Sequence, residues 1–81
     1  MMYRATFKIR IDRKNLTKIE EMLKERWKAT NISSKEISKN CWLVSFRVED
    51  HRKLFALKEV IENYGGKLLR PYVRKEEKIH C

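Results

Sequence analysis

The strongest constraint on the fold is a strict alternation of apolar and polar side chains in two separate stretches. In residues 3–11 every odd position is apolar, and Arg4, Lys8 and Arg10 stand between them. Residues 42–48 repeat the alternation, with Trp, Val, Phe and Val at the even positions. A period of two places alternate side chains on opposite faces of a strand. Both stretches are therefore predicted to be β-strands with one apolar face.

Apolar residues at helical spacing follow each of these strands. Leu16, Ile19, Leu23 and Trp27 form one stripe, and Leu54, Leu57, Ile61 and Tyr64 form another. Spacings of three and four residues predict two amphipathic helices. Asp12 or Asn15 is the expected N-cap of the first helix and Asp50 that of the second. Gly65 is expected to end the second helix as its C′ residue.

The remaining chain predicts two weaker strands at the sheet edges. Residues 30–34 are interpreted as a polar connection, residues 35–38 as an edge strand, and Lys39-Asn40 as a hairpin turn. Residues 67–75 read as a last strand that contains Pro71. Proline cannot donate a ladder hydrogen bond, so this strand is expected at an edge.

The resulting order β-α-β-β-α-β predicts an α+β, ferredoxin-like split βαββαβ fold. Right-handed crossovers give a four-stranded antiparallel sheet of order 4-1-3-2 with two helices on one face. We expect a single domain over residues 1–75 and a short C-terminal tail over residues 76–81. The resemblance is one of element order only.

Composition favours a cytoplasmic protein without a cofactor. The 81 residues include two cysteines, too few for a disulfide scaffold, and show no signal peptide or membrane-spanning apolar run. No metal-ligand spacing is present, and His80-Cys81 could bind metal only with outside ligands. No residue pattern indicates a catalytic site, so an enzyme is not expected.

The formal net charge of +9 is concentrated in the first and last strands. Residues 1–11 hold three cations and no acid, and residues 67–81 hold five cations and two acids. The predicted strand order makes these two strands neighbours, and one sheet face stays open. A directed positive field of this kind suits a polyanion.

The predicted binding residues lie on this open face. Leu69 and Val73 are taken as inward, which turns Leu68 outward; Cys41 and Leu43 are expected on the same face. Lys and Arg would contact phosphates, and Tyr72 would stack on a base. Arg13 and Lys14, beside the first strand, are ranked second. The full predicted nucleic-acid-binding set is Arg4, Lys8, Arg10, Arg13, Lys14, Arg47, Arg70, Tyr72 and Arg74.

The sequence thus predicts a small non-catalytic module that binds RNA or DNA through a basic sheet face with weak sequence specificity. Outward positions of the two central strands hold Thr6, Lys8, Leu43 and Ser45, not the aromatics that an RRM would use. The alternative is a protein-interaction or inhibitor module that docks on an acidic partner, as in phage or viral accessory proteins. A homodimer through the sheet face, or a regulatory ligand-binding domain of the ACT kind, also stays open.

Overall fold

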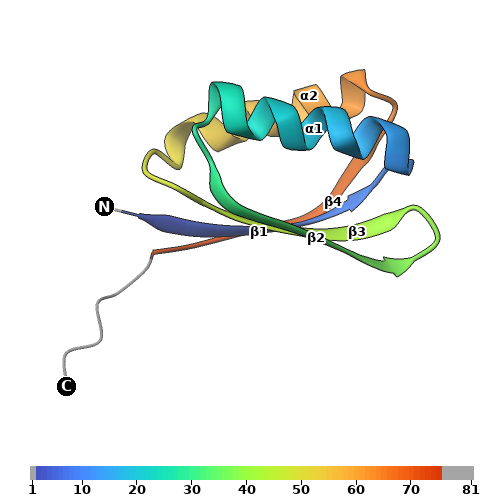
Figure 1. The fold of residues 1–81 in the computed structure, drawn as a ribbon, viewed down its shortest axis with the longest axis horizontal. Coiled ribbons are helices and arrows are strands. Elements are labelled where there is room, and N and C mark those ends of the chain that lie inside the picture. The colour runs from blue at the N-terminus through green and yellow to red at the C-terminus, as the bar shows by residue number, and fades with distance from the viewer. Residues whose placement is uncertain (1, 76–81) are drawn as a thin grey trace.

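The computed structural model describes residues 2–75, with side chains through Pro71. The elements, in chain order, are β1 Tyr3–Arg10, α1 Arg13–Arg26, β2 Thr30–Ser38, β3 Cys41–Val48, the 3-10 helix η1 Arg52–Ala56, α2 Leu57–Asn63 and β4 Lys67–Lys75. The strands form one antiparallel sheet in the order β2-β3-β1-β4, and both helices cover the same face (Figure 1). The predicted ferredoxin-like α+β architecture is confirmed.

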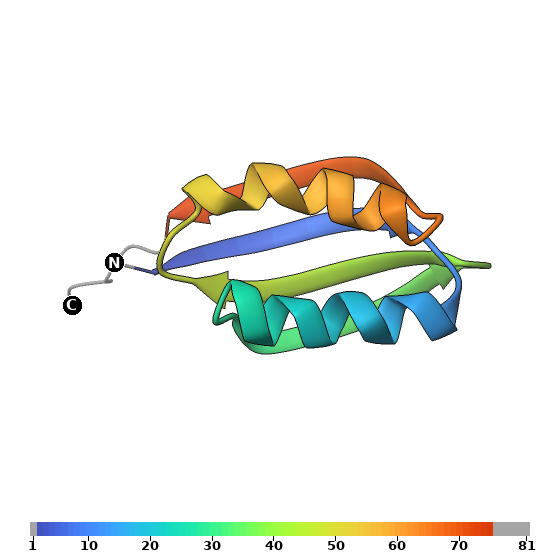
Figure 2. The ribbon, with the colours of Figure 1, turned by 90° about the horizontal axis from the view of Figure 1, so that it is seen from above.

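The core lies between the helices and the inner face of the two central strands. The alternation predicted for β1 and β3 holds, because their apolar sets are buried beneath the helix stripes. Figure 2 shows α1 above the β2–β3 half of the sheet and α2 above the β1–β4 half. Phe7 and Phe46 meet edge to face across the central pair, with ring centroids 5.6 Å apart. The buried core side chains are Ala5, Phe7, Ile9, Ile11, Leu16, Ile19, Leu23, Ala29, Trp42, Val44, Phe46, Val48, Leu54, Leu57 and Ile61.

Of the two candidate caps for α1, Asp12 is the one that acts. Its Oδ1 accepts a hydrogen bond from the backbone N–H of Asn15 at 2.8 Å. This bond satisfies a donor that the first helical turn cannot pair internally. The Asn15 amide instead donates through Nδ2 to the carbonyl of Tyr64 at 3.1 Å. Asn15 therefore links the start of α1 to the end of α2.

The polar connection predicted for residues 30–34 is wrong, because these residues belong to β2. The strand has a register shift between Thr30 and Ser33, and Asn31 adopts a positive φ of 53°. Ser34 turns toward the helices and donates through Oγ to Oε2 of Glu20 at 2.8 Å. An edge strand stabilised by such polar contacts needs no apolar alternation, so its sequence resembles a loop.

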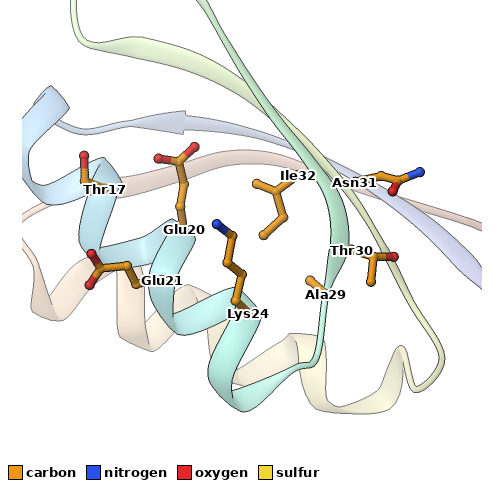
Figure 3. A pocket seen from close by; sticks show the side chains of 8 residues that line it. All are labelled: Thr17, Glu20, Glu21, Lys24, Ala29, Thr30, Asn31 and Ile32. Atoms are coloured by element: carbon orange, nitrogen blue, oxygen red, sulfur yellow. The ribbon is translucent and has the colours of Figure 1, made fainter.

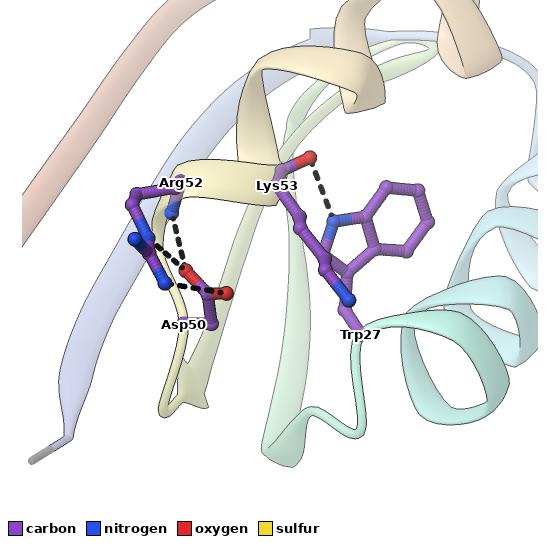
Figure 4. A network of polar contacts seen from close by, with 4 residues as sticks. All are labelled: Trp27, Asp50, Arg52 and Lys53. Carbon is purple, nitrogen blue, oxygen red and sulfur yellow. Dashed lines mark hydrogen bonds and ion pairs between the residues drawn. The ribbon is translucent and has the colours of Figure 1, made fainter.

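The prediction that Asp50 caps the second helix is also wrong. Asp50 Oδ1 accepts from the backbone N–H of Arg52 at 3.0 Å, which is an Asx-turn, and from Arg52 Nε at 3.1 Å (Figure 4). The chain then runs through η1 before α2 begins. The hydrogen bonds from Arg52 lower the pKa of Asp50. Trp27 Nε1 donates to the carbonyl of Lys53 at 2.9 Å and joins α1 to η1.

Two glycines close α2 and lead into β4. Gly65 has a φ of 78°, and its N–H donates to Glu62 while that of Gly66 donates to Ile61. These two bonds form a Schellman motif, as the predicted C′ glycine requires. A Cβ at Gly66 would lie 2.9 Å from the carbonyl oxygen of Arg10. Only glycine at this position lets the α2–β4 turn approach the end of β1.

A bulge in β4 corrects the predicted facing of its first half. Lys8 pairs with Arg70 but Ile9 pairs with Leu68, so Leu69 is the extra residue. Leu68 was predicted to face outward, yet it packs against the core. The extra residue reverses the alternation on the N-terminal side of the bulge. Arg70 retains its predicted outward position, and Pro71 lies on an edge strand as expected.

We expect Phe46→Ala to lower the free energy of unfolding by about 3–5 kcal/mol, because a fully packed ring is removed from the core. Phe46 is 1% exposed. Phe55 on η1 is 84% exposed, so Phe55→Ala is the matched control and should change stability by less than about 0.5 kcal/mol. Urea denaturation of both variants measures the difference. Similar losses in the two variants would contradict the assigned strand faces.

We expect Gly66→Ala to destabilise the protein by about 1–3 kcal/mol, because the added methyl group must displace the Arg10 carbonyl or the Ile61 side chain. Gly65→Asn is the control, since no atom lies within 4 Å of a Cβ there and Asn tolerates a positive φ. Thermal unfolding compares the two variants. A larger loss for Gly65→Asn would show that backbone conformation, not space, governs this turn.

Candidate functional site

The open face of the sheet carries pairs of cations on directly opposed positions of β1 and β4. Arg10 lies opposite Lys67, Lys8 opposite Arg70, and Arg4 opposite Arg74. On the other side of β1, Arg4 is also opposite Arg47 of β3. Within residues 2–75, no element covers this face (Figure 1). We call the Arg10–Lys67 and Lys8–Arg70 pairs, together with Arg4 on β1, the cation ladder.

Like charges on opposed positions destabilise a sheet by about 0.2–1 kcal/mol for each pair. No acidic side chain among the described residues forms an ion pair with Arg4, Lys8, Arg10, Lys67 or Arg70. The ion pairs Asp50–Arg52 and Lys58–Glu62 lie outside the sheet. Among the residues whose side chains are described, no acid therefore offsets the repulsion within the cation ladder. An anion bound on this face would relieve that repulsion.

A shallow hollow of 470 Å³ occupies the centre of the open face. Lys8 and Arg70 of the cation ladder line it together with Thr6, Leu43 and Ile37. Ile37 is 42% exposed, and Leu43 is half-buried. Thr6 and Ser45 share a hydrogen bond of 3.2 Å between their hydroxyl oxygens beside the hollow. The hollow therefore combines an apolar floor with a cationic rim.

The structure brings some of the predicted binding residues together on this face and separates others from it. The outward positions of the three neighbouring strands β3, β1 and β4 include Arg4, Lys8, Arg10, Arg47 and Arg70. The backbone of Tyr72 and Arg74 extends β4 beside Thr6 and Arg4, and their side chains lie outside the described part of the chain.

Arg13 and Lys14 belong to the helix layer. Both are exposed in the first turn of α1, and the Arg13 guanidinium lies 5.5 Å from the centroid of the Trp42 ring. Trp42 faces the core side, where its Nε1 donates to the carbonyl of Ile11 at 3.0 Å. The position of Arg13 is thus explained by a cation–π contact on the opposite side of the sheet.

Sequence reasoning missed Lys67, because a bulge decides its facing, and Ile37, because the polar edge strand offers no apolar alternation from which to assign a face. The bulge at Leu69 aligns Lys67 with Arg10. Ile37, which a register shift between Glu36 and Ser38 leaves without a partner residue on β3, lines the hollow. Cys41, which was predicted to lie on the open face, is only 6% exposed. It lies between Arg10 and Ser38, whose strands flank it on both sides.

A second hollow of 510 Å³ lies between α1 and β2 (Figure 3). Glu20 and Lys24 rise from α1 toward Ile32, and Glu21 lies on the same helix. Two carboxylates and one ammonium group line this space, so its charges do not favour a polyanion. The Glu20 carboxylate also accepts a hydrogen bond from the Ser34 hydroxyl. This hollow is less suited to the predicted ligand than the open face.

The described residues contain no cluster of three His, Cys, Asp or Glu side chains that could hold a metal ion. His51 lies 4.2 Å from the Tyr3 ring, centroid to centroid, beside the Asp50–Arg52 pair. None of the helices in residues 2–75 is long and apolar enough to cross a bilayer. Neither a known protein family nor a characterised protein matches this sequence.

We expect Arg70→Glu to raise the free energy of unfolding at low salt by up to about 1 kcal/mol, because it converts a like-charged pair with Lys8 into an ion pair. Arg70→Gln, which removes the charge without reversing it, is the matched control. Its free energy of unfolding should lie between that of the wild-type protein and that of Arg70→Glu. Since salt screens exposed charges, the differences should shrink in about 1 M NaCl. Denaturation at both salt concentrations checks this order. A less stable Arg70→Glu protein at low salt would contradict the repulsion.

Proposed function

We propose that this protein binds RNA or DNA through the open face of its sheet, without catalysis and with weak sequence specificity. The cation ladder carries the proposal, because the Arg10–Lys67 and Lys8–Arg70 pairs, with Arg4 further along β1, place several positive charges in one row. From Arg4 to Arg10 the row extends over six residues, or about 20 Å at the usual rise of a strand. A phosphate backbone presents negative charges in a row that such a surface can neutralise at several points.

A nucleic acid fits this face better than a second copy of the chain. In an isologous dimer the same patch packs on itself, so the Lys8–Arg70 pair of one protomer would approach cations of the other. Bringing like charges together and removing them from water costs free energy. A polyanion instead neutralises the row and releases bound counterions on association.

Weak specificity follows from the kinds of side chain on the face. Lysine and arginine groups of the ladder are suited to phosphate contacts, which position a ligand without reading its sequence. The amide side chains that read adenine bidentately are absent from the outward positions of β1, β3 and the described part of β4. We therefore expect similar affinities for different sequences of the same length.

Salt dependence of binding is the direct test. If about four phosphates are neutralised, log K should fall with log salt at a slope of roughly −3 to −4. Arg70→Ala with Arg74→Ala should weaken binding to all sequences about equally and flatten the slope by up to ~2. Fluorescence anisotropy with labelled oligonucleotides over a salt series measures both effects.

The matched control removes two charges from the helix layer, by Lys24→Ala with Lys58→Ala. Both lysines are exposed on the opposite side of the molecule. This control should leave the slope nearly unchanged, because it changes net charge without touching the ladder. Salt-insensitive binding, or none to any DNA or RNA at low salt, would overturn the proposal. If the Arg70/Arg74 variant instead lost binding to an acidic protein partner, the proposed function would be that of a protein-docking module.

A further inference from the structure

We infer that the ligand is single-stranded, and that one unpaired base sits in the central hollow against Leu43 and Ile37. This inference rests on the proposed function and specifies which form of nucleic acid the same face takes. The hollow joins two surfaces of different chemistry, an apolar floor and a cationic rim. A nucleotide joins the same two chemistries, since its base has a weakly hydrated face and its phosphate is anionic.

The position of the floor within the cation ladder is the first argument. Leu43 lies directly opposite Lys8 on one side and Lys35 on the other. Lys8 is in turn opposite Arg70. An apolar side chain is thus flanked by cations from three strands in one line across the sheet. A strand of nucleic acid held by these cations would carry its bases over Leu43.

The facing of Ile37 is the second argument. Ile37 lies two residues after Lys35, which is opposite Leu43, so it shares the open face and lines the hollow. The shift between Glu36 and Ser38 leaves it without a partner residue on β3. Ile37 is one of two large apolar side chains that are exposed among the described residues. Its exposed area adds to that of Leu43, and a base that covers both would remove apolar surface from water.

A duplex cannot place a base against Leu43 and Ile37. In a duplex each base is stacked on both faces, so the cation ladder would meet phosphates only. A single strand can turn a base out of its stack and place it against a protein side chain. Arg70 at the rim can add its planar guanidinium to the same base or contact a neighbouring phosphate. The hollow therefore distinguishes single strands from duplexes by chemistry that charge alone does not provide.

The test compares three DNA probes of equal length, about 12 nucleotides, with the full-length protein: an oligothymidylate, a strand of abasic sites, and a duplex. The oligothymidylate should bind at least about fivefold more tightly than the abasic strand, which has the same phosphates. Ile37→Thr with Leu43→Thr should remove that advantage while leaving the abasic and duplex affinities unchanged. Threonine is β-branched, a shape that strands favour, so the sheet should be retained in the double variant.

Phe55→Ser is the matched control, because it removes an exposed apolar side chain from η1, away from the hollow. It should keep the full preference for the oligothymidylate. Equal affinity of the wild-type protein for the base-containing and abasic strands would overturn the inference while the proposed function stood, and so would tighter binding of the duplex. The comparison of the three probes uses the wild-type protein, so it does not depend on whether any variant folds. Failure to bind any of the three probes at low salt would overturn both.

Discussion

The two-sided pairing of β1 is the constraint on which the rest of the structure depends. Its inner face supplies Phe7 and Ile9 to the core, so the strand must lie beneath the helices. Its outer face holds Arg4, Lys8 and Arg10, so every neighbour that pairs with it must accept a basic surface. The core that stabilises the fold and the charge that defines its open face thus come from alternate residues of one strand.

β4 shows how a local irregularity changes a surface. Without the bulge at Leu69, Leu68 would face solvent and Lys67 would face the helices. The extra residue returns Leu68 to the core and places Lys67 opposite Arg10. One bulge therefore improves apolar burial and lengthens the cation ladder, at the cost of another repulsive pair. Repulsion within the ladder is a physical reason to expect an anionic partner.

The charged side chains of the helix layer and those of the open face differ in how far they are engaged by contacts within the fold. Asn15, Trp27 and Ser34 tie the helices to one another and to β2 through hydrogen bonds. Arg13 and Lys18 lie over aromatic rings, and Lys58 pairs with Glu62. Many charges of this layer are thus engaged within the fold. The cations of the β1–β4 ladder instead face away from it, which makes the sheet the better candidate for binding.

The sequence by itself determined the architecture, because the alternation in β1 and β3 and the stripes of Leu16, Ile19, Leu57 and Ile61 leave few ways to bury these residues. It also determined that charge collects on β1 and β4. Only the tertiary structure decided the facing of Leu68 and Lys67, because a bulge depends on the register of two strands and leaves no pattern in either one alone. It also decided the facing of Ile37, because pairing of Lys35 with Leu43 sets which face of the edge strand is open. The tertiary structure likewise decided the start of β2, where Ser34 bonds to Glu20 of α1, and the turn at Asp50, which accepts from Arg52. Secondary-structure propensities do not contain these side-chain hydrogen bonds. The apolar floor and the cationic rim of the candidate site are therefore a product of strand pairing, whereas the fold that carries them follows from alternation.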